Sequence, residues 1–377
     1  MATSHRGHPA ATAEPGHPAH QRIRYFDLLR AGALIRVFIY HATGWLWLCL
    51  LIPAIGLMFG IAGHLMAASL DRHGPAAVVR RAARLMVPFW TFSLAALTLV
   101  HGISLRDGPV SMLDWDQLIW WILPLRVPSA GELSWAWAFT IGLWYISAYL
   151  WLILISPITL WLFRRHPWAC ILTSVAISIG FQVGHIEHGY FVLSYLPCWL
   201  LGFASHDGQL PRLPARTFHL GALLLAVVGG SWIGISMATH PTSTLNHIPI
   251  ATTLWSMAWT AVLMRPHARM ELRRFRQNPV ADRLLRLINA RAATIYLWHI
   301  PASAVIVTVL APMLPLGSAT HLLATLIGMV MLTAVAVLAF GWVETSASRC
   351  ARSCKISSRI PAEQQEPASA DASAITR

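Results

Sequence analysis

Apolar stretches long enough to cross a lipid bilayer recur along the whole 377-residue chain. A helix needs roughly 20 apolar residues to span the hydrocarbon core. The composition, 56% hydrophobic against 11% charged, leaves little material for a soluble surface. We therefore predict an all-α, polytopic membrane protein with about ten transmembrane helices. The ten stretches are about 28–50, 51–70, 85–102, 141–163, 168–186, 189–205, 218–238, 248–264, 292–313 and 320–343.

The segments between these stretches are too short and too polar to form a second core. The sequence thus predicts one membrane domain over residues 24–344, between a disordered leader, 1–23, and a disordered tail, 345–377. Because the first two apolar stretches are almost continuous, we expect a tight reversal at Leu51, Ile52 and Pro53.

The 28 Lys and Arg residues fall almost entirely on alternate connections between the apolar stretches. By the positive-inside rule this places both termini in the cytoplasm of a multi-pass protein of a bacterial inner or plasma membrane. The basic residues do not form one continuous surface, so the net charge of +13 does not indicate nucleic acid as a partner. One basic segment, 265–291, mixes Arg with Leu and Phe at helical spacing and predicts an amphipathic helix against membrane lipid.

The stretch DLLRAGALIRVFIYHATGWLW, which begins at Asp27, places Arg30, Arg36 and His41 among apolar residues. A charge at membrane depth costs about 2.5 to 3.5 kcal/mol on insertion scales, so such a residue needs a partner or a function. On a helix, Arg30 and His41 lie within roughly 20° of the same face and about 16 Å apart, whereas Arg36 points about 140° away from His41. Asp27 can ion-pair with Arg30, and Arg36 can pair with a neighbour or serve another surface. Taken singly, Arg30 is better explained as an anchor at the membrane edge, and His41 is equally well explained as a contact between helices.

Two further motifs carry polar side chains beside apolar stretches. In RRAAR, Arg81 and Arg84 are three residues apart, so on a helix they form a guanidinium pair suited to phosphate, although a positive-inside anchor explains them as well. In IYLWHIP, Tyr296 and His299 lie in the ninth stretch. His299 is a candidate partner for an acceptor or for His41, and a packing role remains an alternative.

Taken in order, these motifs resemble acyltransferase family 3, a family of membrane O-acyltransferases. The resemblance runs from about Arg24 to Glu344. It is carried by DLLR with the following histidine, LMFGIAGHLM, RRAAR before LMVP, LWYIS, IYLWHIP and the terminal WVE.

The resemblance implies a ten-helix enzyme that moves an acyl group from acyl-CoA to a hydroxyl group, and we expect acetyl-CoA as the donor. It implies that His41 is catalytic and that Arg30, Arg81 and Arg84 engage acyl-CoA. Asp27 is assigned to the catalytic group with His41, where we expect it to orient the site rather than to react. No metal is implied. The acceptor is expected to be a hydroxyl-bearing glycan of the cell envelope or a glycosylated small molecule.

The remaining candidate residues are assigned to substrate binding: Arg36, His64, Trp144, Tyr296 and His299. Arg36 and His64 depart from the family pattern, as do Leu28 after Asp27 and the lack of a proline two residues after Glu344. These departures favour tailoring of a glycosylated metabolite over modification of a polymer. A transporter or flippase that uses buried His and Arg for proton or anion passage is the alternative from another class, although we find no internal repeat that would support it.

Overall fold

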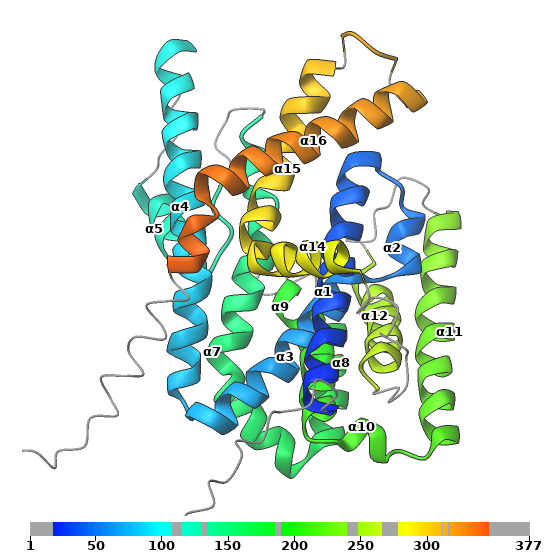
Figure 1. The fold of residues 1–377 in the computed structure, drawn as a ribbon. Coiled ribbons are helices and arrows are strands. Elements are labelled where there is room, and N and C mark those ends of the chain that lie inside the picture. The colour runs from blue at the N-terminus through cyan, green and yellow to red at the C-terminus, as the bar shows by residue number, and fades with distance from the viewer. Residues whose placement is uncertain are drawn as a thin grey trace, which may run out of the picture.

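The computed structural model describes residues 18–107, 115–129, 135–184, 190–239, 248–265, 278–310, 312–315 and 317–346. This part of the chain contains helices and no strands, as predicted for an all-α protein (Figure 1). The helices are α1 Pro18–Thr43, α2 Trp47–Leu51, α3 Ala54–His73, α4 Ala76–Asp107, α5 Trp115–Ile122, α6 Trp137–Thr140, α7 Leu143–Arg165, α8 Pro167–Val183, α9 Tyr190–His206, α10 Gln209–Arg212, α11 Ala215–Thr239, α12 Pro249–Met264, α14 Pro279–Ala290, α15 Ala292–Leu310 and α16 Ala319–Phe340.

Each of the ten predicted apolar stretches overlaps a helix of the structure. Six helical segments of the described chain are long and apolar enough to cross a membrane, and two further apolar helices are shorter. Helix α1 falls outside this set because it is too polar: it carries Asp27, Arg30 and Arg36 as well as His41. The six segments are Trp47–His73, Ala76–Gly102, Trp137–Arg165, Ala215–Thr239, Ala292–Leu310 and Ala319–Phe340.

The chain leaves the helical conformation at Ile52 and Pro53, where a break was expected, and also once before that point. Helix α1 ends at Thr43, where Gly44 adopts a φ of 69° and donates its N–H to the Tyr40 carbonyl at 2.7 Å. A glycine in the left-handed region ends a helix without steric cost, and apolar patterning does not register that signal. The prediction of one helix over 28–50 was therefore wrong: the short helix α2 intervenes before the second break at Ile52 and Pro53.

Helix α3 is the central element, and it packs very closely against α9. A Cβ atom at Gly202 would overlap the Gly60 carbonyl and the His64 N–H, and a Cβ at Gly63 would overlap the Trp199 carbonyl. Small residues let two helix backbones approach in a membrane, where packing and polar contacts take over from the hydrophobic effect. The α3–α9 contact thus depends on the absence of side chains at these glycines.

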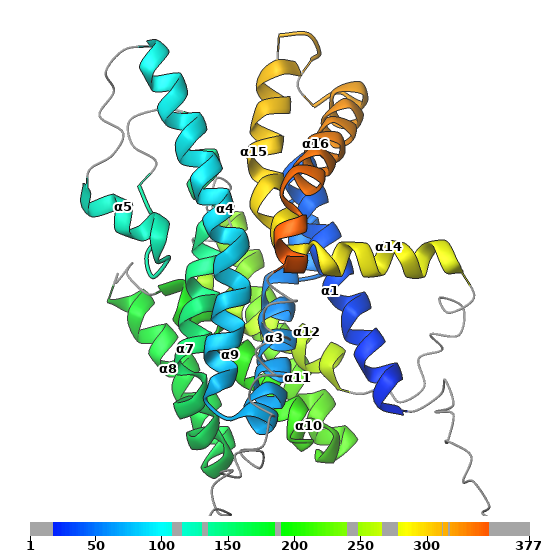
Figure 2. The ribbon, with the colours of Figure 1, turned by 60° about the vertical axis from the view of Figure 1, so that its left-hand side comes forward.

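Helix α14 lies across the other helices, as both views show (Figures 1 and 2). The Asn278 side chain caps it by accepting hydrogen bonds from the N–H groups of Val280 and Ala281 at 3.0 and 3.2 Å. Val280, Leu284 and Leu287 form an exposed apolar stripe along this helix. The sequence predicted a helix over 265–291; residues 279–290 form it, while residues 266–277 lie outside the described chain, and its contact with lipid stays a prediction.

Candidate functional site

A strongly basic cavity of about 740 Å³ opens between the helices. It reaches from exposed side chains such as Arg72 and Arg84 to the buried rings of Tyr145 and Tyr296. Glu344 is the single carboxylate among its lining residues. Helices α1, α3, α4, α7, α14 and α15 contribute to its wall, whose basic members are Arg30, Arg72, His73, Arg80, Arg81 and Arg84.

The cavity brings together Arg30, Arg81 and Arg84, the three arginines that the family resemblance assigned to one ligand. Arg81 and Arg84 lie in the first turns of α4, because this helix begins at Ala76, earlier than predicted. Arg81 donates to the Leu65 carbonyl of α3, and its electrostatic neighbours include Arg84 and Arg30. Three guanidinium groups around one space repel one another, so an anion between them would relieve that repulsion.

Glu344 is held in place at the cavity wall. Its carboxylate accepts a hydrogen bond of 2.8 Å from the Thr294 N–H and another from the Thr294 hydroxyl. Burial raises the pKa of this carboxyl group, whereas the Thr294 hydrogen bonds and Arg291 oppose the rise. The carboxylate therefore orders the start of α15.

The deep end of the cavity is closed by tyrosine rings. Tyr296 donates its hydroxyl to the Gly142 carbonyl at 3.1 Å, and its ring centroid lies 4.8 Å from that of Tyr145. His299 follows one helical turn later, with its ring centroid 5.3 Å from that of Tyr296. Tyr296 therefore separates the cavity from His299.

His41 and His299 lie in direct contact, with ring centroids 4.9 Å apart and planes at 64°. His299 is 1% exposed, whereas His41 is exposed. The structure thus joins two histidines that are 258 positions apart in sequence. The contact makes His41 a neighbour of His299, while the assignment of His299 to substrate binding stays a prediction. His41 is not among the lining residues of the cavity, which ends at Tyr296, so Arg30 and His41 lie on the same continuous helix but do not share one open space.

Two other residues of the predicted stretch are placed away from the cavity. The Arg36 side chain is buried and donates to the Leu48 carbonyl at 2.9 Å, which ties α2 to α1. Asp27 accepts from the Asn289 side chain of α14 through its backbone carbonyl, at 2.8 Å. No ion pair joins Asp27 to Arg30 within the described residues, and the catalytic role assigned to Asp27 stays a prediction.

The last two candidates lie on other faces. His64 is buried on the α9 side of α3, with ring centroids 4.7 Å from Phe26 and 5.2 Å from His206. Trp144 stacks on Tyr195 with ring centroids 5.8 Å apart. The structure brings neither residue to the cavity wall or to the histidine pair, and their assignment to substrate binding stays a prediction.

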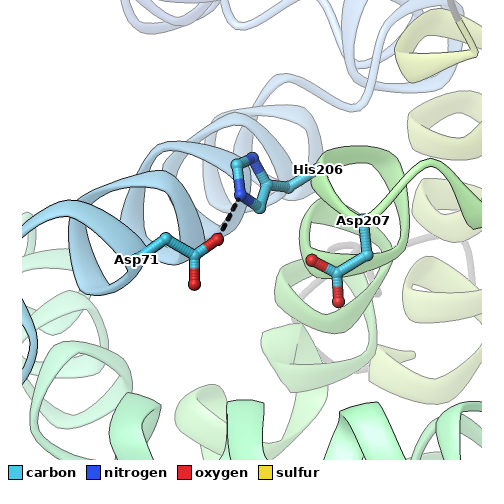
Figure 3. Close-up of side chains that lie close together, drawn as sticks. All are labelled: Asp71, His206 and Asp207. Atoms are coloured by element: carbon cyan, nitrogen blue, oxygen red, sulfur yellow. Dashed lines mark hydrogen bonds and ion pairs between the residues drawn. The ribbon is translucent and has the colours of Figure 1, made fainter.

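One polar cluster escaped the sequence analysis (Figure 3). Asp71, His206 and Asp207 approach closely enough to hold a metal ion. Arg164, however, makes two hydrogen bonds to each carboxylate at 2.8 to 3.0 Å, and His206 Nε2 lies 2.8 Å from Asp71. Because a guanidinium already occupies the position of a cation, the cluster is an ionic tie between α3, α7 and α9.

The residues of this ionic cluster come from three different helices, so no local sequence motif predicts it. A single signal existed: Asp71 and Asp207 are acidic residues at the ends of otherwise apolar helices.

In this helical bundle a pair of histidines, of which His299 is buried and His41 exposed, lies beyond the Tyr296 end of a basic cavity. Residues 23–341 match the family model described as an acyltransferase domain, acyltransferase family 3. Since the match covers most of the chain, the protein belongs to this family and is a membrane acyltransferase. No curated protein and no solved structure matches it.

Proposed function

We propose that this membrane acyltransferase takes an acyl group, most simply acetyl, from acyl-CoA and places it on a hydroxyl of a sugar-containing acceptor. The observation that carries the proposal is the basic cavity that ends at Tyr296. The Tyr296 ring contacts His299, and His299 in turn contacts His41. The family assignment favours this function over transport.

The donor fits the charge of the cavity. Acyl-CoA carries phosphate groups at one end and a thioester at the other. Guanidinium groups bind phosphate through paired, charge-assisted hydrogen bonds, and five arginines line this cavity. The phosphates would lie among Arg30, Arg81 and Arg84, and the pantetheine arm would point toward Tyr296. The acyl group then has to pass beside the Tyr296 ring to reach His41.

The chemistry assigns His41 as the general base. A neutral imidazole takes the proton from the acceptor hydroxyl while the hydroxyl oxygen attacks the thioester carbonyl carbon. The resulting tetrahedral intermediate collapses, the carbon–sulfur bond breaks, and the imidazolium returns the proton to the departing thiolate. The products are the ester and free CoA, and no net proton is consumed. Such general-base help contributes about 10² to 10⁴ in rate.

The exposure of His41 supports an acceptor that approaches from a different side than the donor. Donor phosphates enter through the cavity, whereas an acceptor can reach the imidazole from outside the helix bundle. An acyltransferase that joins a cytoplasmic donor to an acceptor elsewhere needs two such approaches. A glycosylated metabolite or an envelope glycan would meet this requirement.

The test compares the wild-type protein with His41→Ala, purified in detergent, using labelled acetyl-CoA and a mixture of glycosylated acceptors. We expect the variant to insert and to bind donor normally but to lose acyl transfer. Full transfer by His41→Ala would refute the assignment of the base. Uptake or release of a solute by wild-type vesicles, with no loss of thioester, would instead establish the transporter alternative.

A further inference from the structure

The buried imidazole of His299 has a hydrogen-bonding pattern that fixes its tautomer. Its Nδ1 atom lies against the Tyr296 carbonyl of the preceding turn. A carbonyl oxygen can only accept a hydrogen bond, so Nδ1 must carry the proton. A neutral imidazole has one N–H and one lone pair, and the lone pair is therefore on Nε2.

That Nε2 atom is buried and has no hydrogen-bond partner among the described residues. Buried polar atoms in proteins are nearly always paired, so an unpaired acceptor in a 1% exposed side chain needs an explanation. The polar ring beside it belongs to His41, 4.9 Å away between centroids. Two imidazoles joined by a direct N–H···N bond have centroids about 5 Å apart, given a nitrogen separation near 2.9 Å.

We propose that His299 is the positioning residue for His41. The two rings are in contact but not hydrogen-bonded in this structure, and a turn of the His41 ring would place its N–H on Nε2 of His299. The opposite nitrogen of His41 would then be free to act as the base. The inference rests on the proposed function, because it assigns a partner to the same catalytic group. The resulting series runs from the Tyr296 carbonyl through His299 to His41. It has the logic of a base held by a third group, with a neutral histidine in the position that a carboxylate often occupies.

A neutral partner suits this location. A carboxylate beside His41 would place another charge at membrane depth, whereas neutral His299 orients the ring at lower desolvation cost. When His41 takes the acceptor proton, the lone pair of His299 faces the new imidazolium and stabilises it. The proton stays on His41 until the thiolate leaves, because His299 Nδ1 remains bonded to the carbonyl.

Two amide substitutions separate this role from packing. The Oε1 atom of Gln at position 299 can occupy the place of Nε2, whereas Asn reaches only the Nδ1 position. We expect His299→Leu and His299→Asn to lower kcat by about 10²-fold, with KM for acyl-CoA unchanged. The kcat of His299→Gln should be about tenfold higher than that of His299→Asn, because Gln keeps one hydrogen bond that Asn loses.

Ser303→Ala serves as the control, because the Ser303 hydroxyl donates to the His41 backbone carbonyl at 3.0 Å and does not involve the ring. We expect it to keep kcat. Thermal unfolding of each purified variant identifies any that fail to fold, and the comparison of Gln with Asn then uses the folded pair. Equal rates for these two variants, or full activity of His299→Leu, would overturn the inference. If His41→Ala is inactive while His299→Leu is fully active, only this inference fails; if His41→Ala is active, the proposed function fails first.

Discussion

Arginine side chains in this protein differ in what surrounds their guanidinium groups, and each surrounding implies a different result on substitution. Arg84 is exposed and lines the cavity. Arg36 is buried and bonded to a backbone carbonyl. Arg165, near the end of α7, lies over the Trp161 ring and away from the cavity.

Removal of the Arg84 guanidinium should weaken donor binding. Hydrogen bonds to charged groups are worth about 1.5 to 3 kcal/mol, so Arg84→Ala should raise KM for acyl-CoA by about tenfold or more. Added salt should reduce the difference, because an exposed charge is screened. Initial rates over a range of acyl-CoA concentrations measure the effect.

The control for Arg84 is Arg165→Ala, which removes the same charge outside the cavity. It should leave KM unchanged. Equal KM values for wild type and Arg84→Ala would identify RRAAR as a positive-inside anchor.

Arg36→Met should act on stability and leave KM for acyl-CoA unchanged. The substitution removes the hydrogen bond between α1 and α2, at a cost of about 1.5 to 3 kcal/mol. A lower thermal midpoint in detergent with wild-type KM is the expected pair of results. A raised KM for the acceptor with an unchanged midpoint would instead support the substrate-binding role that the sequence assigned to this residue.

At the residue scale, helical periodicity predicted several relative positions correctly, because a helix fixes the angle and the rise between successive residues. It predicted that Arg30 and His41 share a helix, and spacing predicted the Arg81 and Arg84 pair. It could not place Arg36 or His64, since their partners Leu48 and His206 depend on where other elements lie. For His299 the sequence left open whether its partner is the acceptor or His41, or whether it only packs. Its contact with His41 depends on tertiary packing, which no local pattern encodes.

At the scale of elements, the contact between α3 and α9 determines how the bundle is assembled. Gly202→Ala should destabilise the protein, because the added methyl group would overlap the backbone of α3 at Gly60. Overpacking typically costs about 1 to 3 kcal/mol. Thermal unfolding followed by fluorescence-detected size exclusion measures the loss.

Gly221→Ala on α11 is the matched control, because a Cβ atom there meets nothing within 4 Å. It should be neutral or stabilising by up to about 1 kcal/mol, the helix-propensity gain of Ala over Gly. Similar destabilisation by both substitutions would mean that the close α3–α9 contact is not what limits stability.

Element existence was predicted better than element ends. Apolar length identifies a helix in a membrane protein because every backbone group must be satisfied within the segment. Ends depend on local features, such as Gly44 after α1, or on polar first turns, such as those of α4 that contain Arg80 and Arg81. Hydropathy ignores both, which explains why α1 was predicted too long and α4 too short.

At the scale of the whole molecule, the ionic cluster of Asp71, Arg164, His206 and Asp207 ties three helices together at one end. Because Arg164 and Asp71 are 41% and 39% exposed in their side chains, each pair should contribute no more than about 1 kcal/mol. Arg164→Met should therefore lower the thermal midpoint slightly at low salt. The difference should vanish in about 1 M salt, where the Debye length is about 3 Å.

Arg165→Met, one residue further along α7, is the control for this comparison, because Arg165 takes part in no ion pair among the described residues. A large loss for Arg164→Met that persists in high salt would show that the cluster acts as a buried unit.

The two sides of α3 make different demands on the same helix. Gly56, Gly60 and Gly63 face its neighbours α9 and α12, whereas Ala62 and Leu65 face the cavity. A substitution that shifts α3 relative to α9 therefore also shifts the part of the cavity wall that Ala62 and Leu65 form. Residues on the α9 side of α3, which never touch a donor, can therefore change which donors fit the cavity, and substitutions there are a route by which donor range can evolve.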